Sequence, residues 1–466
     1  MRRQATGTSR CIGPCCRRVI DSAEGGLQAG VMEIRPFETE RDLKAIQRIW
    51  REIGWIDSDA GEAAVADMLA TGCCLTAALD GQAECMAHRS LGAMRYQNSA
   101  RNRSFVPNLA PGAHEDLSMC AVTAVMTSRI ARKLGLALRL TARQLAAGAE
   151  DGAALAVLGV FDQGFYDRLG FGTGSYEHTL RFDPATLQVD TPFRPPKRLT
   201  KDDWQAVHGA MMNRRRGHGG CLLPEAGLMK AELGFRPNGF GFGYERDGAL
   251  THCVWLVAEE MEHGPYQVEM LAYQDGPQLL ELLALLKSLG DQVSLIEMRE
   301  PPDVQLQTLL KEPFRNRRKT RNSDYAAYHR TAAWWQLRML DVGACVAARH
   351  WPGEKVQFNL KLTDPVAEFL PDGSWRGCAG DYRISVGPSS WAEPGHRDDL
   401  PTLRASVNAF SRLWFGVAPA TGLAVTDGLN VEAPVHDSDF MASPAPLLDR
   451  LDEALCLPPP RTGWDF

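Results

Sequence analysis

The chain has 466 residues, of which 44% are hydrophobic and 23% are charged; this composition is typical of globular proteins, and the length predicts roughly three domains. Its formal net charge of −6 argues against a nucleic-acid-binding protein, which usually presents a basic face. No apolar run approaches the roughly 20 residues of a membrane-spanning helix, so no membrane span is expected.

Residues 1–31 contain arginines but no apolar core, so we expect a disordered tail, or an upstream start ahead of Met32, rather than a signal peptide. The 12 cysteines are scattered, and several, such as Cys120, lie in apolar runs, where cysteine behaves as a small hydrophobic residue. No cluster has the spacing of a zinc site, so no metal is expected. This cysteine usage fits a reducing cytoplasm.

Residues 32–185 are predicted to form a mixed α/β domain, because strand-like and helical patterns alternate along this part of the chain. In chain order these are an extended segment at 32–37, a helix at 38–50, strands at 73–80 and 118–126, a helix at about 130–145, and strands at 153–161 and 176–182.

Residues 186–330 repeat this pattern after a proline-rich passage that resembles a linker. Thr200 and Asp203 are predicted to cap a helix, and Asp247-Gly248 is predicted to form the turn of a β-hairpin. A strand, a helix and a strand then follow at 267–273, 277–290 and 292–298.

Residues 331–466 are predicted to form a small α+β domain with a large apolar surface. A helix is expected over "WWQLRMLDVGACVAAR" (334–349), and "KVQFNLKL" (355–362) alternates like a half-buried strand. Leu403, Val407 and Phe410 follow the spacing of a second amphipathic helix.

The segment "VTAVMTSRIARKLGLALRL" is the most informative part of the sequence. A strand is predicted to end near Thr127, and Arg132-x-x-Gly135-x-Ala137 lies where the next helix begins. Small residues let a ligand approach the backbone, and the unpaired amides of a first helical turn favour a phosphate. The pattern alone is weak, because "RRRGHG" at 214–219 matches it without the flanking strand and helix.

The order strand, Arg-x-x-Gly-x-Ala, helix, strand and tyrosine resembles the GNAT superfamily of N-acetyltransferases. More narrowly, "VTAVMTSRIARKLGL" with "FYDRLGFG" resembles the Eis (enhanced intracellular survival) family, and "VEMLAY" with "LLALLKSL" is similar to the second GNAT-like domain of that family. "WWQLRMLDVGACVAAR" and "ATGLAVTDGL" resemble its sterol-carrier-protein-like third domain. The resemblance implies an α/β (α+β) fold with two GNAT-like acyl-CoA N-acyltransferase domains, 32–185 (the active one) and 186–330, followed by the sterol-carrier-like domain, 331–466.

The resemblance also implies which residues bind acetyl-CoA. The backbone of Val125 and Thr127 would pair with the pantetheine, and Phe161 and Asp162 would border the thioester. The pyrophosphate would be lined by the turn and first helical residues: Arg132, Lys133, Leu134, Gly135, Leu136, Ala137 and Leu138.

Two further residues match the catalytic groups of that family. Tyr166 matches the general acid, and the terminal carboxylate of Phe466 matches the general base. A phenol with a pKa of about 10 can reprotonate a thiolate whose conjugate acid has a pKa of about 8.5. The alternatives are that Tyr166 only packs at a strand–helix corner, and that Trp464 and Phe466 only anchor the chain end. Trp50 and Trp55 are expected in the core rather than in an acceptor pocket.

Two functions from different classes follow. The first is an acetyl-CoA-dependent N-acetyltransferase that modifies a primary amine of the aminoglycoside or lysine type, in a cytoplasmic enzyme that forms a homo-oligomer, a homohexamer by resemblance. The alternative is a lipid- or acyl-chain-binding protein with a vestigial acetyltransferase site, supported by the thin basic run before Gly135 and by Phe161.

Overall fold

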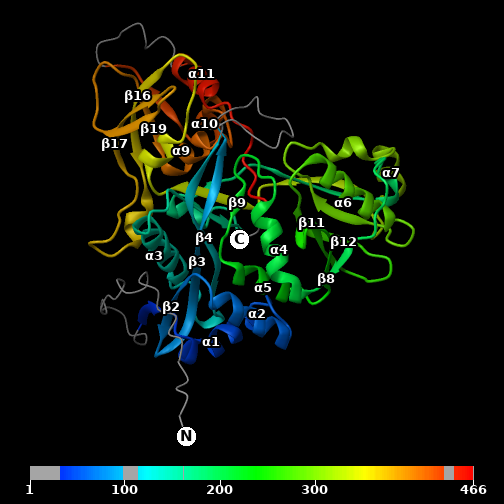
Figure 1. Cartoon of the computed structure of the whole chain (residues 1–466). Helices are drawn as coiled ribbons and strands as arrows, with labels where there is room; N and C mark the ends of the chain where they lie inside the picture. The colour runs from blue at the N-terminus through cyan, green and yellow to red at the C-terminus, as the bar shows by residue number, and fades with distance from the viewer. Residues whose placement is uncertain (1–31, 98–113, 161, 435–444, 465–466) are drawn as a thin grey trace.

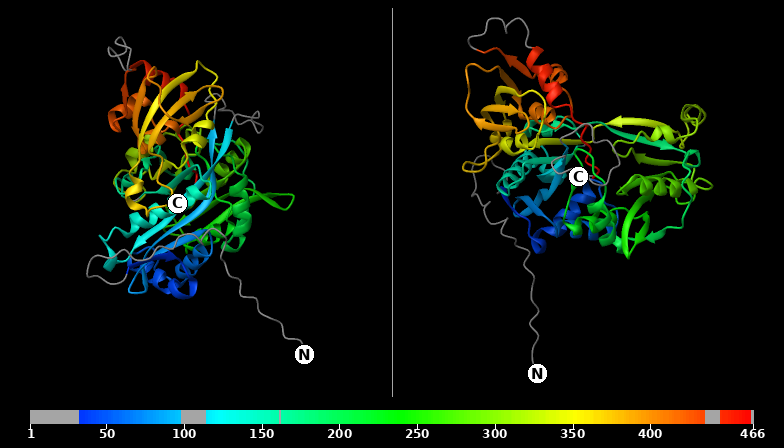
Figure 2. Two further views of the ribbon diagram at one scale, coloured as in Figure 1. Left: turned by 90° about the vertical axis from the view of Figure 1, so that its left-hand side faces the viewer. Right: turned by 45° about the horizontal axis from the view of Figure 1, so that its top comes forward.

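The computed structural model describes residues 32–97, 114–160, 162–434 and 445–464. Within these residues the chain forms three β-sheets of eight, seven and five strands. Each sheet, with its helices, makes one lobe of the molecule, and the segment after the last helix runs from the third lobe into the space between the other two (Figure 1). Figure 2 shows the same arrangement from two further directions.

The first sheet has the strand order β1-β2-β3-β4-β5-β15-β6, and β9 pairs with β3. Its strands are β1 (Met32–Pro36), β2 (Cys73–Leu79), β3 (Gln82–Gln97), β4 (His114–Thr127), β5 (Leu155–Gly159), β6 (Gly172–Thr173), β9 (Cys221–Leu222) and β15 (Trp335–Met339). The helices α1 (Thr39–Glu52) and α3 (Leu136–Glu150) pack against β3 and β4. The strands predicted at 32–37, 73–80, 118–126 and 153–161 are therefore confirmed.

The second sheet has the order β14-β7-β13-β12-β11-β10-β8. Its strands are β7 (Glu177–Phe182), β8 (Lys197–Leu199), β10 (Gly239–Arg246), β11 (Ala249–Ala258), β12 (Tyr266–Ala272), β13 (Ile296–Arg299) and β14 (Tyr328–Ala332). The predicted hairpin turn is confirmed, since Asp247 and Gly248 have φ angles of 53° and 79° between β10 and β11. The capping box of Thr200 and Asp203 is confirmed as well.

The third sheet has the order β18-β17-β16-β19-β20. Its strands are β16 (Val356–Thr363), β17 (Gly380–Val386), β18 (Trp391–Pro394), β19 (Thr402–Ser406) and β20 (Asn430–Glu432). The other helices of the described chain are α2 (Asp59–Leu69), α4 (Trp204–Asn213), α5 (Ala226–Gly234), α6 (Gly276–Ser288), α7 (Pro313–Lys319), α8 (Val342–Ala347), α9 (Val407–Trp414), α10 (Ala420–Thr426) and α11 (Ala445–Ala454). None of them has the length and apolar character needed to cross a bilayer.

Three strands lie in a different sheet from the rest of their predicted domain, and one of them is β9, which pairs with β3 in the first sheet. β7 leaves the first domain and pairs with β13 and β14 in the second sheet. β15 lies at the start of the predicted third domain but pairs with β5 and β6 in the first sheet. These exchanges join the predicted domains across the limits at 185 and 330.

Three predicted elements differ from the structure. The segment 334–349, predicted as one helix, forms the strand β15 followed by the short helix α8. Every residue of β15 is buried, so the spacing of its apolar residues does not distinguish a strand from a helix. Leu403 belongs to β19, and the helix begins at Val407. The helix predicted from Ile130 begins at Leu136, after a separate 3₁₀ turn at Arg129–Ala131.

The cores of the first and third domains are continuous. One buried cluster contains Ile46 and Met119 from the first domain together with Phe358 and Trp414 from the third. The second sheet and α6 enclose a separate core. The third domain is therefore packed onto the first rather than tethered to it.

Candidate active site

The strands β4 and β5 separate at the centre of the first sheet. They pair in parallel from Met119↔Leu155 to Val122↔Leu158, and beyond Val122 the strand β4 pairs with β3 alone. The amide of Val160 turns to the carbonyl of Trp334, at 2.8 Å, so the chain after β5 follows β15. This divergence leaves one edge of β4 open over Thr123–Thr127, where a ligand can pair with the backbone.

A β-bulge shapes the same part of β4. Met86 pairs with Met126 and His88 with Thr123, so Ala124 and Val125 both lie opposite Ala87. Ala124 has a φ of 50°, a conformation that costs a non-glycine residue about 1–2 kcal/mol. Bulges of this kind re-aim backbone groups beside functional sites. The sequence gives no signal for it, since no glycine stands at this position.

The turn between β4 and α3 has the conformation expected for an anion cradle. Lys133 and Gly135 have φ angles of 68° and 74°. A side chain at Gly135 would meet open space, so the backbone there is accessible. Gly135 is the N-cap of α3 and no side chain caps the helix, so its first-turn amides face outwards.

The predicted cofactor residues occupy three kinds of position. Arg132, Lys133, Leu134 and Gly135 are exposed on the turn. The side chains of Leu136 and Leu138 are 1% and 3% exposed, so only their backbone can face a ligand, while Ala137 is half-buried.

The remaining predicted residues lie along the open edge and beyond β5. Val125 is half-buried, and the Oγ1 atom of Thr127 lies 3.2 Å from Sγ of Cys85. Asp162 is exposed after β5. Phe161 and Phe466 lie outside the described residues.

Tyr166 begins a short 3₁₀ turn, Tyr166–Leu169, and lines a cavity of about 330 Å³. The side chain is 3% exposed, and its ring packs edge-on against Phe165, with the ring centroids 4.9 Å apart. Burial raises the pKa of the phenol above its ordinary value because it penalises the phenolate. The same cavity is lined by Thr123, Ala124 and Val125 from the open edge of β4.

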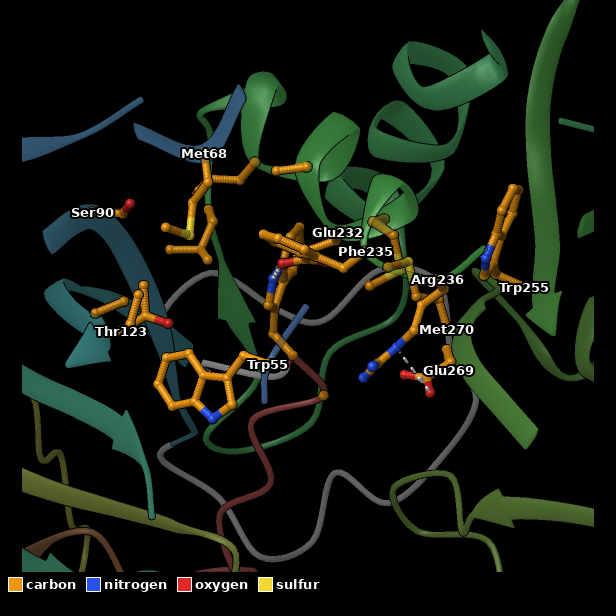
Figure 3. A pocket seen from close by; sticks show the side chains of 18 of the residues that line it. Trp55, Met68, Ser90, Thr123, Glu232, Phe235, Arg236, Trp255, Glu269 and Met270 are labelled. Carbon is orange, nitrogen blue, oxygen red and sulfur yellow. Dashed lines mark hydrogen bonds and ion pairs between the residues drawn. The ribbon is translucent and has the colours of Figure 1, made fainter. Parts of the chain in front are cut away.

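A second, larger cavity of about 530 Å³ adjoins the first and is open to solvent. The residues that line both are Trp55, Thr123, Ala124, Arg236 and Trp464. Figure 3 shows Thr123 and Ser90 on one side of the larger cavity, with Arg236, Glu269 and Met270 opposite. The second domain therefore forms the far wall of a cleft whose floor is β4.

The family model described as "Acetyltransferase (GNAT) domain" matches residues 108–174. This match covers the open edge of β4, the turn at Gly135 and Tyr166. The first domain is a GNAT acetyltransferase domain. No curated protein matches the sequence significantly.

Solved structures share the fold of the whole described chain. A GCN5-related N-acetyltransferase from Kribbella flavida is 17% identical, with a TM-score of 0.66, over 94% of this chain and 99% of that chain. Eis1 from Mycobacterium abscessus is 19% identical, with a TM-score of 0.65, over 94% and 100%. A GCN5-related N-acetyltransferase from Anabaena variabilis is 13% identical, with a TM-score of 0.68 and the same coverage as Eis1.

The larger cavity beside the GNAT domain's tyrosine combines aromatic rings with carboxylates. Trp50 stacks on Phe235 with ring centroids 5.1 Å apart, and it meets Trp55 edge-on at 5.0 Å. The carboxylate of Glu269 lies 3.6 Å from Nε of Arg236. Trp50 is a core residue, at 6% exposure, that also lines the cavity, whereas the prediction of a core position for Trp55 is wrong, since its side chain is 47% exposed and lines both cavities.

Sequence reasoning missed the carboxylates of this cavity. Glu232 belongs to α5 and Glu269 to β12, and no local pattern marks either residue. They reach the GNAT domain only because the second domain packs against it, which is a long-range property of the fold.

The C-terminal segment is held between the first two domains by its backbone. The amide of Arg461 donates to the carbonyl of His218, and the amide of Cys221 donates to the carbonyl of Thr462, both at 2.8 Å. Trp464 is 4% exposed and lines both cavities. The prediction that this segment docks is therefore confirmed as far as Trp464.

The second domain repeats the β4–α3–β5 unit with one chemical difference. β12 and β13 pair in parallel from Tyr266↔Ile296 to Val268↔Met298, and α6 connects them. Here the carboxylate of Asp275 accepts a hydrogen bond of 2.9 Å from the amide of Gln278 at the start of α6. A fixed negative charge thus occupies the place where the uncapped α3 can receive a phosphate.

Two histidines on strands, His88 of β3 and His178 of β7, have structural roles. Nε2 of His88 lies 2.8 Å from the carbonyl oxygen of Thr71, and burial lowers the pKa of His88 to about 4. His178 contacts His329 on the neighbouring strand, 3.0 Å away. No group of three or more potential metal ligands occurs among the residues that the structure describes.

Proposed function

We propose that the chain is an acetyl-CoA-dependent N-acetyltransferase that modifies a primary amine of the aminoglycoside or lysine type. The observation that carries this proposal is one continuous cleft. It joins the open edge of β4, the cavity that Tyr166 lines, and a larger cavity whose walls carry aromatic rings and both carboxylates and guanidiniums.

The fit of acetyl-CoA to the GNAT domain rests on the backbone. The pantetheine pairs with β4 near Val125 and Thr127, where β5 has turned away. The pyrophosphate lies on the turn from Arg132 to Leu138, where the N-terminus of α3 is uncapped and Gly135 admits close approach. Arg132 and Lys133 add positive charge at this turn.

The protein's own groups then handle charge and protons. A backbone amide between Val125 and Thr127 stabilises the negative oxygen that forms when the amine attacks the thioester. Tyr166 gives its proton to the departing thiolate. With an ordinary pKa of about 10 the phenol is protonated at neutral pH, and burial raises that pKa further, so the proton is available when the thiolate forms.

The acceptor cavity suits a positively charged amine. Its lining pairs two carboxylates, Glu232 and Glu269, with two guanidiniums, Arg236 and Arg299, and the exposed ring of Trp55 can attract a cation through its quadrupole. The proton that the attacking amine loses is assigned to the terminal carboxylate of Phe466. The support for this assignment is Trp464, which reaches the wall shared by both cavities.

Calorimetric titration of acetyl-CoA into the purified protein tests the proposal. We expect micromolar binding, followed by acetylation of one or more amines in an acceptor screen with free coenzyme A as the second product. Absence of binding would overturn the acetyltransferase assignment and turn attention to the lipid-binding alternative, which predicts thermal stabilisation by acyl-chain ligands instead.

The base assignment has its own test. Adding two glycines after Phe466 moves the terminal carboxylate away from Phe466 and leaves the rest of the sequence unchanged. We expect turnover to fall by two or more orders of magnitude with acetyl-CoA affinity unchanged. Wild-type turnover of the extended chain would show that another group accepts the proton.

The remaining predictions concern assembly and the third domain. A homohexamer, a cytoplasmic location and a sterol-carrier-like third domain follow from the resemblance to the Eis family. Sedimentation of the purified chain tests the first of these.

A further inference from the structure

Tyr166 is positioned by the turn that carries it and by the apolar side chains around its ring. Within the part of the chain that the structure describes, its phenol oxygen has no hydrogen-bond partner that would orient the ring. The residue sits on a single 3₁₀ turn, Tyr166–Leu169, which follows β5 and leads into the two-residue strand β6. Such a short turn has little stiffness of its own, so its neighbours determine where the phenol points.

The third domain supplies hydrogen bonds to this turn. Asn408, on α9, donates from Nδ2 to the carbonyl oxygens of Asp167, at 3.0 Å, and Phe171, at 2.7 Å. One side-chain amide thus ties together both ends of the segment that starts at the tyrosine.

A buried ion pair holds the same turn from another direction. Arg338 donates to the carbonyl of Leu169, and its Nη2 atom lies 2.6 Å from the carboxylate of Asp364. Both side chains are fully buried. Gln336 adds a hydrogen bond of 2.7 Å to the carboxylate of Asp167. Arg338 and Gln336 come from β15, and Asp364 directly follows β16 of the third domain.

The backbone after the tyrosine also packs closely against α9 at two glycines. A side chain at Gly170, whose φ is 82°, would lie 2.5 Å from Cγ1 of Val407. One at Gly172 would lie 2.6 Å from the carbonyl oxygen of Asn408. Tyr166 itself shares a buried apolar cluster with Val366 and Leu370 of the third domain.

We propose that the third domain is a positioning element for the reaction, and that Asn408 and Arg338 are the residues through which it fixes the turn that carries Tyr166. This inference rests on the proposed role of Tyr166 as the proton donor. Proton transfer needs the phenol within hydrogen-bond reach of the departing sulfur, and a displacement of about 1 Å can lower the rate 10²-fold. The third domain therefore acts on catalysis without touching the substrates.

The experiment compares two asparagines of the third domain in the full-length protein. Asn408→Ala removes the two bonds to the tyrosine turn. Asn359→Ala is the matched control, because Nδ2 of Asn359 also donates to two carbonyls, those of Arg397 at 2.7 Å and Leu400 at 3.0 Å, within the third domain. We expect both variants to melt earlier than the wild type. Only Asn408→Ala should lower kcat, by about 10- to 100-fold, with the KM for acetyl-CoA unchanged.

A double-mutant cycle separates positioning from general destabilisation. If Asn408 acts through the phenol, Asn408→Ala lowers kcat much less in a Tyr166→Phe background than in the wild type. A purely structural role would lower kcat by the same factor in both backgrounds. Should Asn408→Ala fail to fold, Gln336→Leu removes the bond to Asp167 alone and enters the same cycle, with a smaller expected loss.

The outcomes distinguish this inference from the proposed function. Equal losses in both backgrounds, or an Asn408→Ala enzyme with wild-type kcat beside an impaired Tyr166→Phe enzyme, would overturn the positioning role and leave the acid role intact. Wild-type kcat in Tyr166→Phe would overturn both.

Discussion

The indole Nε1 of Trp464 donates a hydrogen bond of 2.9 Å to Oε1 of Glu232, and this contact joins the C-terminal segment to α5 at the wall of the larger cavity. The guanidinium of Arg214 lies over the same ring, 5.4 Å from its centre, and donates a bond of 3.0 Å to the carbonyl of Gly463. A residue near the chain end thus forms a fixed part of a pocket built from two other domains.

Trp464→Ala should impair acceptor binding more than cofactor binding. Removal of a buried aromatic anchor costs more than about 1.4 kcal/mol, which corresponds to about a tenfold rise in the KM for the amine. The dissociation constant for acetyl-CoA, measured by calorimetry, should stay within about threefold of the wild-type value. Trp391→Ala is the control, since Trp391 lies on β18 and lines neither cavity. If Trp464→Ala loses as much affinity for acetyl-CoA as it loses for the amine, the two cavities do not bind the two substrates separately.

Gly135→Asp should abolish acetyl-CoA binding without unfolding the GNAT domain. The substitution places a negative charge at the first turn of α3 and forces a side chain into a φ of 74°, so we expect affinity to fall at least 100-fold.

Gly152→Asp is the matched control for that substitution. Gly152 follows the other end of α3, has a φ of 85° and also faces open space. The Gly152→Asp variant therefore has the same backbone strain and the same added charge, but at a place distant from the turn at Gly135. Its affinity for acetyl-CoA should equal that of the wild type. Similar losses in the two variants would mean that strain, rather than the phosphate position, explains the result.

Tyr166→Phe should lower kcat by about 10²- to 10⁴-fold while acetyl-CoA binds normally. Because the pKa of the phenol is raised, its proton is retained as pH rises, and wild-type kcat should not decline between pH 7 and 10 through loss of this proton. Tyr176→Phe is the control, since this exposed tyrosine lines neither cavity. A normal kcat in Tyr166→Phe would show that Tyr166 is not the proton donor and that its ring only packs in the core.

The part of the site that the sequence predicts is the part with local signals. The strand ends at Thr127, the small residue Gly135 stands where the next helix begins, and the tyrosine follows β5, as the sequence indicates. Each of these features is fixed by residues within a few positions, where turn chemistry and apolar runs are informative.

The part that the sequence does not predict depends on distant contacts. The bulge at Ala124 is imposed by the pairing of β4 with β3, and an alanine there gives no hint of a positive φ. β15 is buried on both faces between β5 and β6, so its pattern could not identify a strand. Glu232 and Glu269 become site residues only when the second domain closes the cleft.

A histidine at the junction of the three domains links stability to pH. Nδ1 of His218 accepts a hydrogen bond of 3.0 Å from the amide of Gln97, and Nε2 lies 2.9 Å from the carbonyl oxygen of Phe415. The first bond requires a neutral ring with its proton on Nε2. Burial lowers the pKa of His218 to about 4, whereas an unfolded chain has a histidine pKa of about 6.5. The unfolded state therefore binds more protons than the folded state between these two values, and stability is full above pH 6.5 and is lost as pH falls towards 4.

His218→Gln should reduce this acid sensitivity. Glutamine can accept from Gln97 and donate to Phe415 without titrating, so the variant should lose about 2–3 kcal/mol less of its unfolding free energy than the wild type between pH 7 and pH 4.5. Urea unfolding at the two pH values measures the difference. His396→Gln is the control, because it makes the same substitution at an exposed position of the third domain. If the wild type and His218→Gln lose the same unfolding free energy, the hydrogen bonds of neutral His218 are not a source of the acid sensitivity. His88, which is buried with a similarly lowered pKa, is then the residue to substitute next.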